Sequence, residues 1–425
     1  MTKVNVFWFR RDIRISDNTA LRAALKGDLP VLILFIFDES ILDELLMDDP
    51  RVNFIYDELH KINESLKSLD SSILVKKGEP ILEWKKLISE YEINCVFSNR
   101  DYEPYALQRD NEIKLFLKES GIQWQDFKDQ VIYEKNDILK KNGEPYTVFT
   151  PYKNRWLENF SLVEIEKMNF DNLLKSTHTF PSKEALGVVI NDIKVLPFTL
   201  NATSLYASQR DYPFKNIGSY LGPHLRFGTI SIREIIISLE DKSEVFISEL
   251  IWREFFMQIL CHFPKVVSNN FRSKYDGINW RNNQDEFQKW KDGKTGYPLV
   301  DAGMRELNKT GYMHNRVRMV TAGFLCKHLL IDWKWGEAYF AEKLLDYELS
   351  SNNGNWQWAA GTGCDAAPYF RVFNPKLQLE KFDKNCDYVN KWVPEYGTSL
   401  YADPIVEHSF ARNRAIETYK TGILS

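Results

Sequence analysis

The hydrophobic pattern changes its period part-way along the chain, and this change constrains the fold more than any other feature. Four short runs rich in Val, Ile and Phe have the composition of strands buried in a parallel sheet. They lie at residues 4–9, 30–38, 73–77 and 94–98. Between them, apolar residues such as Leu59, Ile62 and Leu66 recur at helical spacing. Strands that alternate with helices predict a doubly wound α/β domain with a parallel sheet over residues 1–130.

The second half of the chain lacks strand-like runs. Residues 131–203 have weak periodicity and polar runs, which are typical of a connector between domains. Beyond this connector, the apolar residues follow a helical period in long segments. The segments lie at residues 230–239, 248–262, 298–308, 316–330 and 335–345. We therefore predict an all-α domain over residues 204–425.

Composition argues against several classes of protein. The chain is 44% apolar, enough for substantial cores, but it has no apolar run long enough to span a membrane. The N-terminus becomes charged at once, so we expect no secretory signal and a cytoplasmic protein. The five cysteines lack the paired spacing of zinc or redox sites, so we expect free thiols and no metal. A net charge of −4 argues against a basic coat, although it allows a local basic groove.

Tryptophan is concentrated in the helical half, where eight of the twelve lie between Trp252 and Trp392. Three strings there are unusual: SELIWREFF at 248–256, TGYMHNRVRM at 310–319 and NNGNWQWAAGTGCDAAPYFRVFNP at 352–375. On a helix, Asn352 and Trp356 share a face, whereas Trp358 points to a nearly opposite side. Taken singly, each tryptophan is better explained as a core residue. Together they can present one indole to a cofactor and the other to a substrate.

A glycine-containing segment, residues 218–222, precedes Pro223 and a helical pattern. There is no GxGxxG after the first strand, so the usual dinucleotide fingerprint is missing. Small residues that open a helix expose backbone N–H groups and favour an anion such as a pyrophosphate. In isolation an ordinary Gly/Pro turn explains this segment better.

Four strings together resemble the photolyase/cryptochrome family, and within it the class I cyclobutane pyrimidine dimer (CPD) photolyases. They lie at residues 7–21, 144–156, 293–319 and 352–375. The resemblance implies an α/β antenna domain followed by a helical domain that binds FAD. It also implies a monomeric deoxyribodipyrimidine photo-lyase, a carbon–carbon lyase. Such an enzyme repairs CPDs in DNA by electron transfer from excited reduced FAD.

The resemblance also assigns residues to the flavin. The implied flavin-binding residues are Tyr206, Gly218, Ser219, Tyr220, Leu221, Gly222, Arg253, Asn315, Arg318, Asp346, Tyr347 and Glu348. Asn352 matches the position that faces flavin N5, where an amide can accept or donate a hydrogen bond. Gly218 and Gly222 depart from the family, which usually has hydroxyl residues there. We expect backbone amides to bind the phosphates instead.

Further positions match the family's electron-transfer and DNA-binding residues. Trp280, Trp333 and Trp356 correspond to an electron-hopping chain from the surface to the flavin. Photolyases are among the enzymes that flip their target out of the duplex, and Trp252 and Trp358 correspond to aromatic walls around the flipped dimer. The other implied DNA or substrate contacts are Arg210, Glu249, Arg316 and Met319.

Three alternatives stay open. A blue-light cryptochrome shares the fold, but usually has a long C-terminal tail, and this chain ends at Ser425. A (6-4) photolyase typically has two adjacent histidines where this chain has His314 and Asn315. An electron-transfer flavoprotein would not explain the tryptophan-rich half. The antenna chromophore, if present, is deazaflavin, FMN or folate, and folate is disfavoured because Tyr105 and Ala106 replace an Asn-Glu pair.

Overall fold

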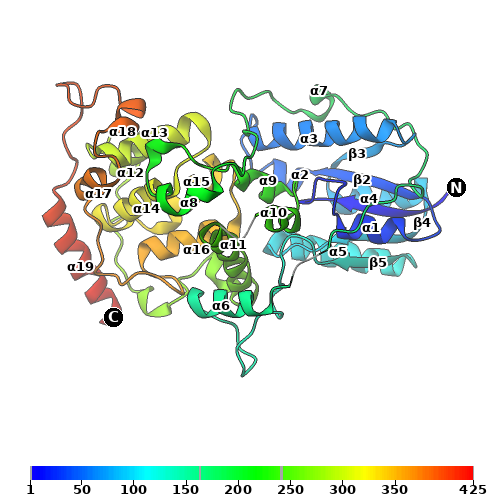
Figure 1. Cartoon of the computed structure of the whole chain (residues 1–425), viewed down its shortest axis with the longest axis horizontal. Helices are drawn as coiled ribbons and strands as arrows, with labels where there is room; N and C mark the ends of the chain where they lie inside the picture. The colour runs from blue at the N-terminus through cyan, green and yellow to red at the C-terminus, as the bar shows by residue number, and fades with distance from the viewer. Residues whose placement is uncertain (1, 162–163, 240–242, 425) are drawn as a thin grey trace. The chain divides into compact units, whose positions relative to one another are not determined.

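The computed structural model describes residues 2–161, 164–239 and 243–424. Its contacts divide the chain into two compact units, each assembled from three stretches of sequence (Figure 1). Unit 1 comprises Met1–Glu134, Phe160–Phe198 and Tyr220–Glu240. Unit 2 comprises Lys135–Asn159, Thr199–Ser219 and Asp241–Ser425. The chain therefore passes between the units several times.

Unit 1 is built on a parallel sheet with the strand order β3-β2-β1-β4-β5. The strands are β1 (Lys3–Phe9), β2 (Val31–Asp38), β3 (Ile73–Gly78), β4 (Glu92–Asn99) and β5 (Gln123–Phe127). The predicted doubly wound α/β fold is confirmed, together with its four predicted strands. The pattern did not indicate β5, because its sequence QWQDF is largely polar and lies at the sheet edge, where no residue is fully buried.

Helices cover both faces of this sheet. Phe7 and Phe9 of β1 share a core with α1 (Thr19–Leu25) and α3 (Pro50–Lys67). Val6 and Trp8 point to the other face and pack with α4 (Pro80–Glu90) and α5 (Pro104–Glu119). This alternation follows from the period of two along a strand. The short helices of this unit are α2 (Glu39–Leu42), α7 (Lys183–Leu186), α9 (Leu221–Phe227) and α10 (Ile232–Ser238).

A buried ion network anchors the segment that carries α10 to the sheet of unit 1. Asp129 is 1% exposed and accepts hydrogen bonds from Arg14 at 2.5 Å and from Arg233 of α10 at 2.8 Å. Thr19 also donates its hydroxyl to Asp129 at 2.9 Å. Burial by itself raises the pKa of the Asp129 carboxyl, but the two guanidinium groups outweigh it and leave that pKa lowered.

Unit 2 is helical, as predicted. Its longer helices are α6 (Phe149–Asn159), α11 (Glu244–His262), α12 (Gln284–Lys291), α13 (Pro298–Thr310), α14 (Asn315–Gly323), α15 (Trp333–Lys343), α16 (Leu349–Ala360), α17 (Pro375–Phe382) and α19 (His408–Leu424). The shorter α8 (Thr203–Gln209) and α18 (Asp387–Trp392) complete the set that bears on the site. The segment predicted as one helix over 316–330 is divided, because α14 passes into a π-helical turn at Phe324–His328.

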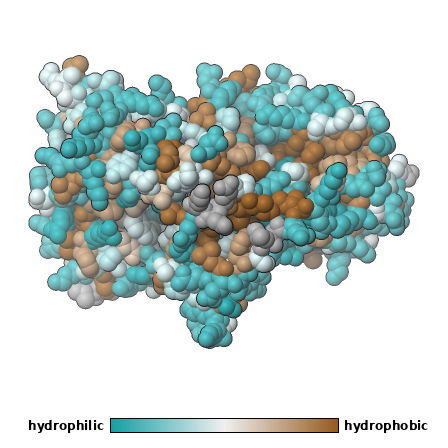
Figure 2. Space-filling view, in the orientation of Figure 1, coloured by the Kyte–Doolittle hydropathy of each residue, from teal (hydrophilic) through white to brown (hydrophobic). Residues whose placement is uncertain are grey.

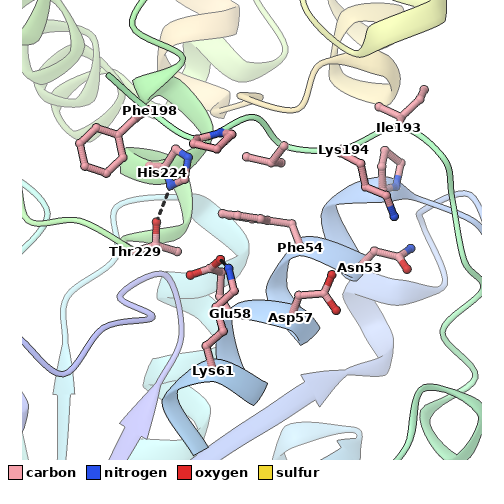
Figure 3. A pocket seen from close by; sticks show the side chains of 13 residues that line it. Asn53, Phe54, Asp57, Glu58, Lys61, Ile193, Lys194, Phe198, His224 and Thr229 are labelled. Atoms are coloured by element: carbon pink, nitrogen blue, oxygen red, sulfur yellow. Dashed lines mark hydrogen bonds and ion pairs between the residues drawn. The ribbon is translucent and has the colours of Figure 1, made fainter. Parts of the chain in front are cut away.

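A cavity of about 380 Å³ lies within unit 1, between α3 and the segment 193–198 (Figure 3). Three of its charged lining residues are paired, since Glu58 bonds Lys61 at 2.6 Å and Asp57 bonds Lys183 at 2.7 Å. The two ring nitrogens of His224 also have partners, at 2.9 Å each. Most of the polar groups on its walls are therefore held by neighbours within unit 1.

The described residues include no helix that is both long and apolar enough to cross a membrane. Figure 2 shows hydrophilic residues over most of the visible face, with apolar residues in patches between them.

We predict that Asp129→Asn lowers the free energy of unfolding by roughly 3–5 kcal/mol, because it removes the carboxylate charge beside the buried Arg14 and leaves Arg233 with Asp17 as its remaining counter-charge. Denaturant titration measures this change. In wild type the contribution is present above pH ~4 and is lost as pH falls toward the lowered pKa of Asp129. Asp171→Asn, at an exposed position of the same unit, should change stability by less than about 0.5 kcal/mol. An equal effect of both substitutions would contradict this account.

Candidate functional site

The helix α16 lies at the centre of unit 2 and packs closely on two neighbours. A Cβ atom at Gly336 of α15 would collide with the indole of Trp356, and one at Gly354 would collide with the ring of Phe256 on α11. The missing side chains therefore let α15 and α11 approach α16. This close packing fixes the rotation of α16 and so the direction of its side chains.

The two tryptophans of α16 have different environments. Trp356 is 2% exposed, with its ring centroid 4.9 Å from that of Phe340 and 6.2 Å from that of Trp290. Trp358 is half-buried and lines a narrow crevice together with Met319 of α14. One helix thus presents one indole to the core and one toward the surface of unit 2.

Asn352 is buried one turn before Trp356, and its amide is held by a neighbour. Its Nδ2 donates to the backbone oxygen and to the Oε1 of Glu337, both at 3.0 Å. Burial raises the pKa of the Glu337 carboxyl. Glu337 was not among the residues predicted from the sequence. The neighbouring Gly336, against which the Trp356 indole packs, is the sequence feature that could have pointed to this contact.

Ion pairs hold the carboxylates next to α16. Arg318 of α14 bonds Asp346 at 2.9 Å and the backbone oxygen of Met313 at 2.8 Å. Arg253 of α11 lies 3.4 Å from Glu348, which is 5% exposed. Within the described part of the chain, the buried Oδ1 of Asp346 has no hydrogen-bond partner. Tyr347, between these two acids, is half-buried, whereas Asn315 at the start of α14 is exposed.

The predicted phosphate segment spans the boundary between the units. Gly218 and Ser219 belong to unit 2, whereas Tyr220, Leu221 and Gly222 belong to unit 1. A Cβ at Gly218 would meet no atom within 4 Å, so the space beside this backbone is open. In unit 2, Tyr206 of α8 packs edge-on against Phe246 with centroids 5.1 Å apart, and burial raises its pKa to about 12.

The residues predicted to contact DNA are held by partners within unit 2. Arg210 bonds Glu249 at 2.5 Å, and Arg316 bonds Asp211 at 2.6 Å. The structure thus brings together two predicted residues, Arg210 and Glu249, as an ion pair.

Trp252 is stacked on a residue of the connector. Its ring lies parallel to that of Phe149 on α6, with the centroids 3.6 Å apart. The predictions included neither Phe149 nor Asp211, because neither contact is local in sequence.

The three tryptophans of the predicted electron chain lie in or against one core. Trp333 is 1% exposed and donates its indole N–H to Asn270 at 2.9 Å. Trp356 belongs to the same buried cluster, and the half-buried Trp280 packs against it. Trp290, which is fully buried beside Trp356, was not among the predicted residues.

In unit 1, Tyr105 and Ala106 lie in the first turn of α5. The Tyr105 hydroxyl donates to Asp38 at 2.7 Å, and Ala106 is buried. Ala106 therefore offers no polar side chain at a position where the folate-binding pattern has one.

Two family models match this chain. Residues 246–399 match the model described as the FAD binding domain of DNA photolyase, and residues 5–170 match the model described as DNA photolyase. The curated "Deoxyribodipyrimidine photo-lyase" of Halobacterium salinarum is 37% identical and aligns over 98% of this chain and 99% of its own. This chain therefore belongs to the DNA photolyase family, and it is an enzyme of the photo-lyase type.

Two solved photolyase structures have a similar fold over nearly the full length of this chain. A bacterial class III photolyase from Agrobacterium tumefaciens matches with a TM-score of 0.88 and 33% identity, covering 100% of this chain and 98% of its own. An archaeal photolyase from Sulfolobus tokodaii, solved with two FAD molecules, matches with a TM-score of 0.86 and 34% identity, covering 99% and 100%.

The residues present in unit 2 fit an FAD. Arg318 and Asp346 offer a cation beside a carboxylate with one oxygen left to bond, and the open space at Gly218 allows a ligand to approach the backbone. FAD, whose isoalloxazine and phosphates carry donors and acceptors, would be held by such groups.

We predict that Asp346→Asn weakens FAD binding about tenfold or more, because it removes the charge opposite Arg318. Dialysis of the purified protein against FAD, followed by absorbance, measures this affinity. Asp285→Asn, at an exposed position of α12, is the matched control and should retain FAD as wild type does. Equal FAD affinity in both variants would remove Asp346 from the flavin site.

Proposed function

We propose that this protein repairs cyclobutane pyrimidine dimers in DNA under light. One observation carries the proposal: α16 buries Trp356 in the core and leaves Trp358 half-exposed, so that one rigid helix serves a cofactor and a substrate. The relatives named deoxyribodipyrimidine photo-lyase support this interpretation. On the family resemblance, plant cryptochromes have an aspartate where this chain has Asn352, and (6-4) photolyases typically have two histidines where it has His314 and Asn315. Both differences favour dimer repair over these alternatives.

Reduced FAD, when bound and excited by light, supplies the electron that opens a cyclobutane ring. The protein's own residues have to hold and orient the groups around it. Glu337 fixes the amide plane of Asn352 through its Nδ2, which leaves the amide oxygen free to face the ring system. Arg318 and Asp346 hold opposite charges in a half-buried pair beside it.

The proposed substrate site is aromatic and lies on the other side of α16. A dimer has to leave the duplex stack before a side chain can enclose it. Trp252, kept flat by its stack on Phe149, and the half-buried Trp358 are proposed as the two walls. Met319 shares a crevice with Trp358 and extends that wall with a polarizable side chain. Base stacking on such rings favours a flat pyrimidine pair.

Two arginines are proposed to meet the DNA backbone. Arg316 and Arg210 each have a carboxylate partner, Asp211 and Glu249, in the structure. These carboxylates fix the guanidinium groups before DNA arrives. A DNA phosphate then has to compete with Asp211 for Arg316, which weakens this contact for every DNA. Only DNA with a flipped dimer gains the aromatic contacts that compensate for this loss.

We predict opposite phenotypes for the two tryptophans of α16. Trp358→Ala should raise the dissociation constant for dimer-containing DNA roughly tenfold to a hundredfold, since stacking on an aromatic ring contributes about 1–3 kcal/mol. Flavin photoreduction should be unchanged. Trp356→Phe should abolish photoreduction, because phenylalanine is much harder to oxidise, and should leave dimer affinity close to wild type. Binding titrations and illumination traces on both variants measure this, and exchanged phenotypes would contradict the placement of α16.

We predict that Arg316→Ala weakens binding to damaged DNA and lowers the salt slope, the change of log affinity with log salt, by about one. The measurement is a binding titration at several salt concentrations. Arg412→Ala, at an exposed position of α19, removes the same charge elsewhere and should leave the slope unchanged. If the slope is the same in wild type and Arg316→Ala, Arg316 does not contact phosphate.

A further inference from the structure

A buried lysine, Lys327, lines the same crevice as Trp358 of the proposed substrate wall, and it has no role in the proposed repair reaction. Lys327 lies on the π-helical turn Phe324–His328 and is 2% exposed. A buried ammonium requires close partners, because its desolvation is costly. A π-helical turn inserts an extra residue into a helix and is often found at functional positions. Lys327 is thus a buried cation on an irregular helical turn, and its contacts show what it holds together.

The partners of Lys327 come from three separate parts of unit 2. Its Nζ donates to the backbone oxygen of Ala360 at 2.6 Å and to that of Tyr369 at 3.4 Å. The same Nζ lies 3.6 Å from the ring centroid of Tyr419 on α19. An ammonium has three N–H donors, and two carbonyl oxygens and one aromatic face receive them. Each N–H of the ammonium thus has a group that can receive it.

Lys327 and one of these partners lie close to Trp358. Ala360 is the last residue of α16, two positions after Trp358, and Tyr369 belongs to the loop 361–374 that follows. Lys327 and Trp358 line the same crevice of about 10 Å³, together with Met319. Gly361 has a φ of +87°, and a Cβ there would stand 3.3 Å from Nζ of Lys327. The helix end is therefore shaped around the ammonium.

The C-terminal helix takes part in the same arrangement. Tyr419 is fully buried and donates its hydroxyl to the Ala360 oxygen at 2.7 Å, so that this oxygen accepts two hydrogen bonds. The ring of Tyr419 is also stacked on Tyr369, with centroids 6.0 Å apart and an angle of 6°. The end of α16 and its following loop are thus tied to both the π-helical turn and α19.

We propose that Lys327 is a positioning residue for the damaged substrate: its ammonium ties the end of α16 and the loop 361–374 to α19, and so holds Trp358 in place. The inference rests on the proposed function. Because Lys327 lines the crevice of Trp358 and supports the end of α16 through a backbone oxygen, without a contact to the Trp356 indole in the described residues, its loss should affect dimer affinity and leave flavin photoreduction unchanged.

The test compares Lys327→Met with wild type. Methionine has a similar length but cannot donate, while Tyr419 still satisfies the Ala360 oxygen. We expect the dissociation constant for dimer-containing DNA to rise roughly three- to tenfold, with unchanged affinity for undamaged DNA, since the tie acts only through Trp358. Lys309→Met, at an exposed position of α13, removes the same charge and should bind dimers as wild type does.

Amide hydrogen exchange supplies a readout that does not depend on repair. The amides of Gly361, Thr362 and Gly363 all bond the Gln357 oxygen, at 2.9, 2.9 and 3.0 Å. They should exchange faster in Lys327→Met, without a matching change in α13. Unchanged exchange in residues 361–374 would overturn the inference. So would normal dimer affinity in the variant when wild type binds dimers. If wild type itself bound no dimers, the proposed function would fail, and the inference with it.

A pH profile of the wild type needs no variant. Burial lowers the pKa of Lys327 to about 7, so the third donor is lost as pH rises through neutrality. Around it, burial raises the pKa of the Cys326 thiol and of the Tyr419 phenol. Lysine is therefore the group that titrates there. Dimer affinity should fall roughly two- to threefold between about pH 6 and pH 8, while affinity for undamaged DNA does not. A flat profile would overturn the inference.

Discussion

The helical unit depends on the close packing of α16 between α15 and α11. Two glycines, Gly336 and Gly354, leave room for Trp356 and for Phe256 at the contacts. Larger residues would force the helices apart, since protein interiors have no spare volume. Because α16 is rigid, the burial of Trp356 also decides where Asn352 and Trp358 lie. The steric constraint at two glycines thus fixes which side chains of α16 face the core and which face the surface of unit 2, and the proposed function depends on this division.

Several arginines of unit 2 form ion pairs with carboxylates of the same unit. Arg210, Arg316 and Arg318 are paired with Glu249, Asp211 and Asp346, respectively. Such pairs explain how a chain with a net charge of −4 can offer fixed guanidinium groups. Under the proposed function an incoming DNA phosphate has to displace a carboxylate, so the gain in affinity is modest and geometry contributes more to selectivity.

The two residues of the proposed substrate wall, Trp252 on α11 and Trp358 on α16, are supported by residues from other elements. Phe149, which lies far earlier in the chain, stacks on the Trp252 ring and fixes its orientation. Lys327 and Tyr419 both donate hydrogen bonds to the backbone oxygen at the end of α16. Rigid aromatic walls need such a supporting shell, because a loosely held ring loses part of its stacking energy to entropy. Residues without direct contact to DNA can therefore influence how tightly it binds.

Periodicity and composition were sufficient to predict the α/β fold of the first domain, four of its five strands and the helical character of the second half. These features depend on local side-chain patterns, which survive without knowledge of distant contacts. The family strings placed Trp356 and Trp358 on one helix, and their spacing separated their directions. The edge strand β5, with its polar QWQDF, carried too weak a pattern. The partners Glu337, Phe149, Asp211 and Lys327 became visible only in three dimensions, because each meets a residue from another element, and such pairings arise when the chain packs rather than from its local sequence.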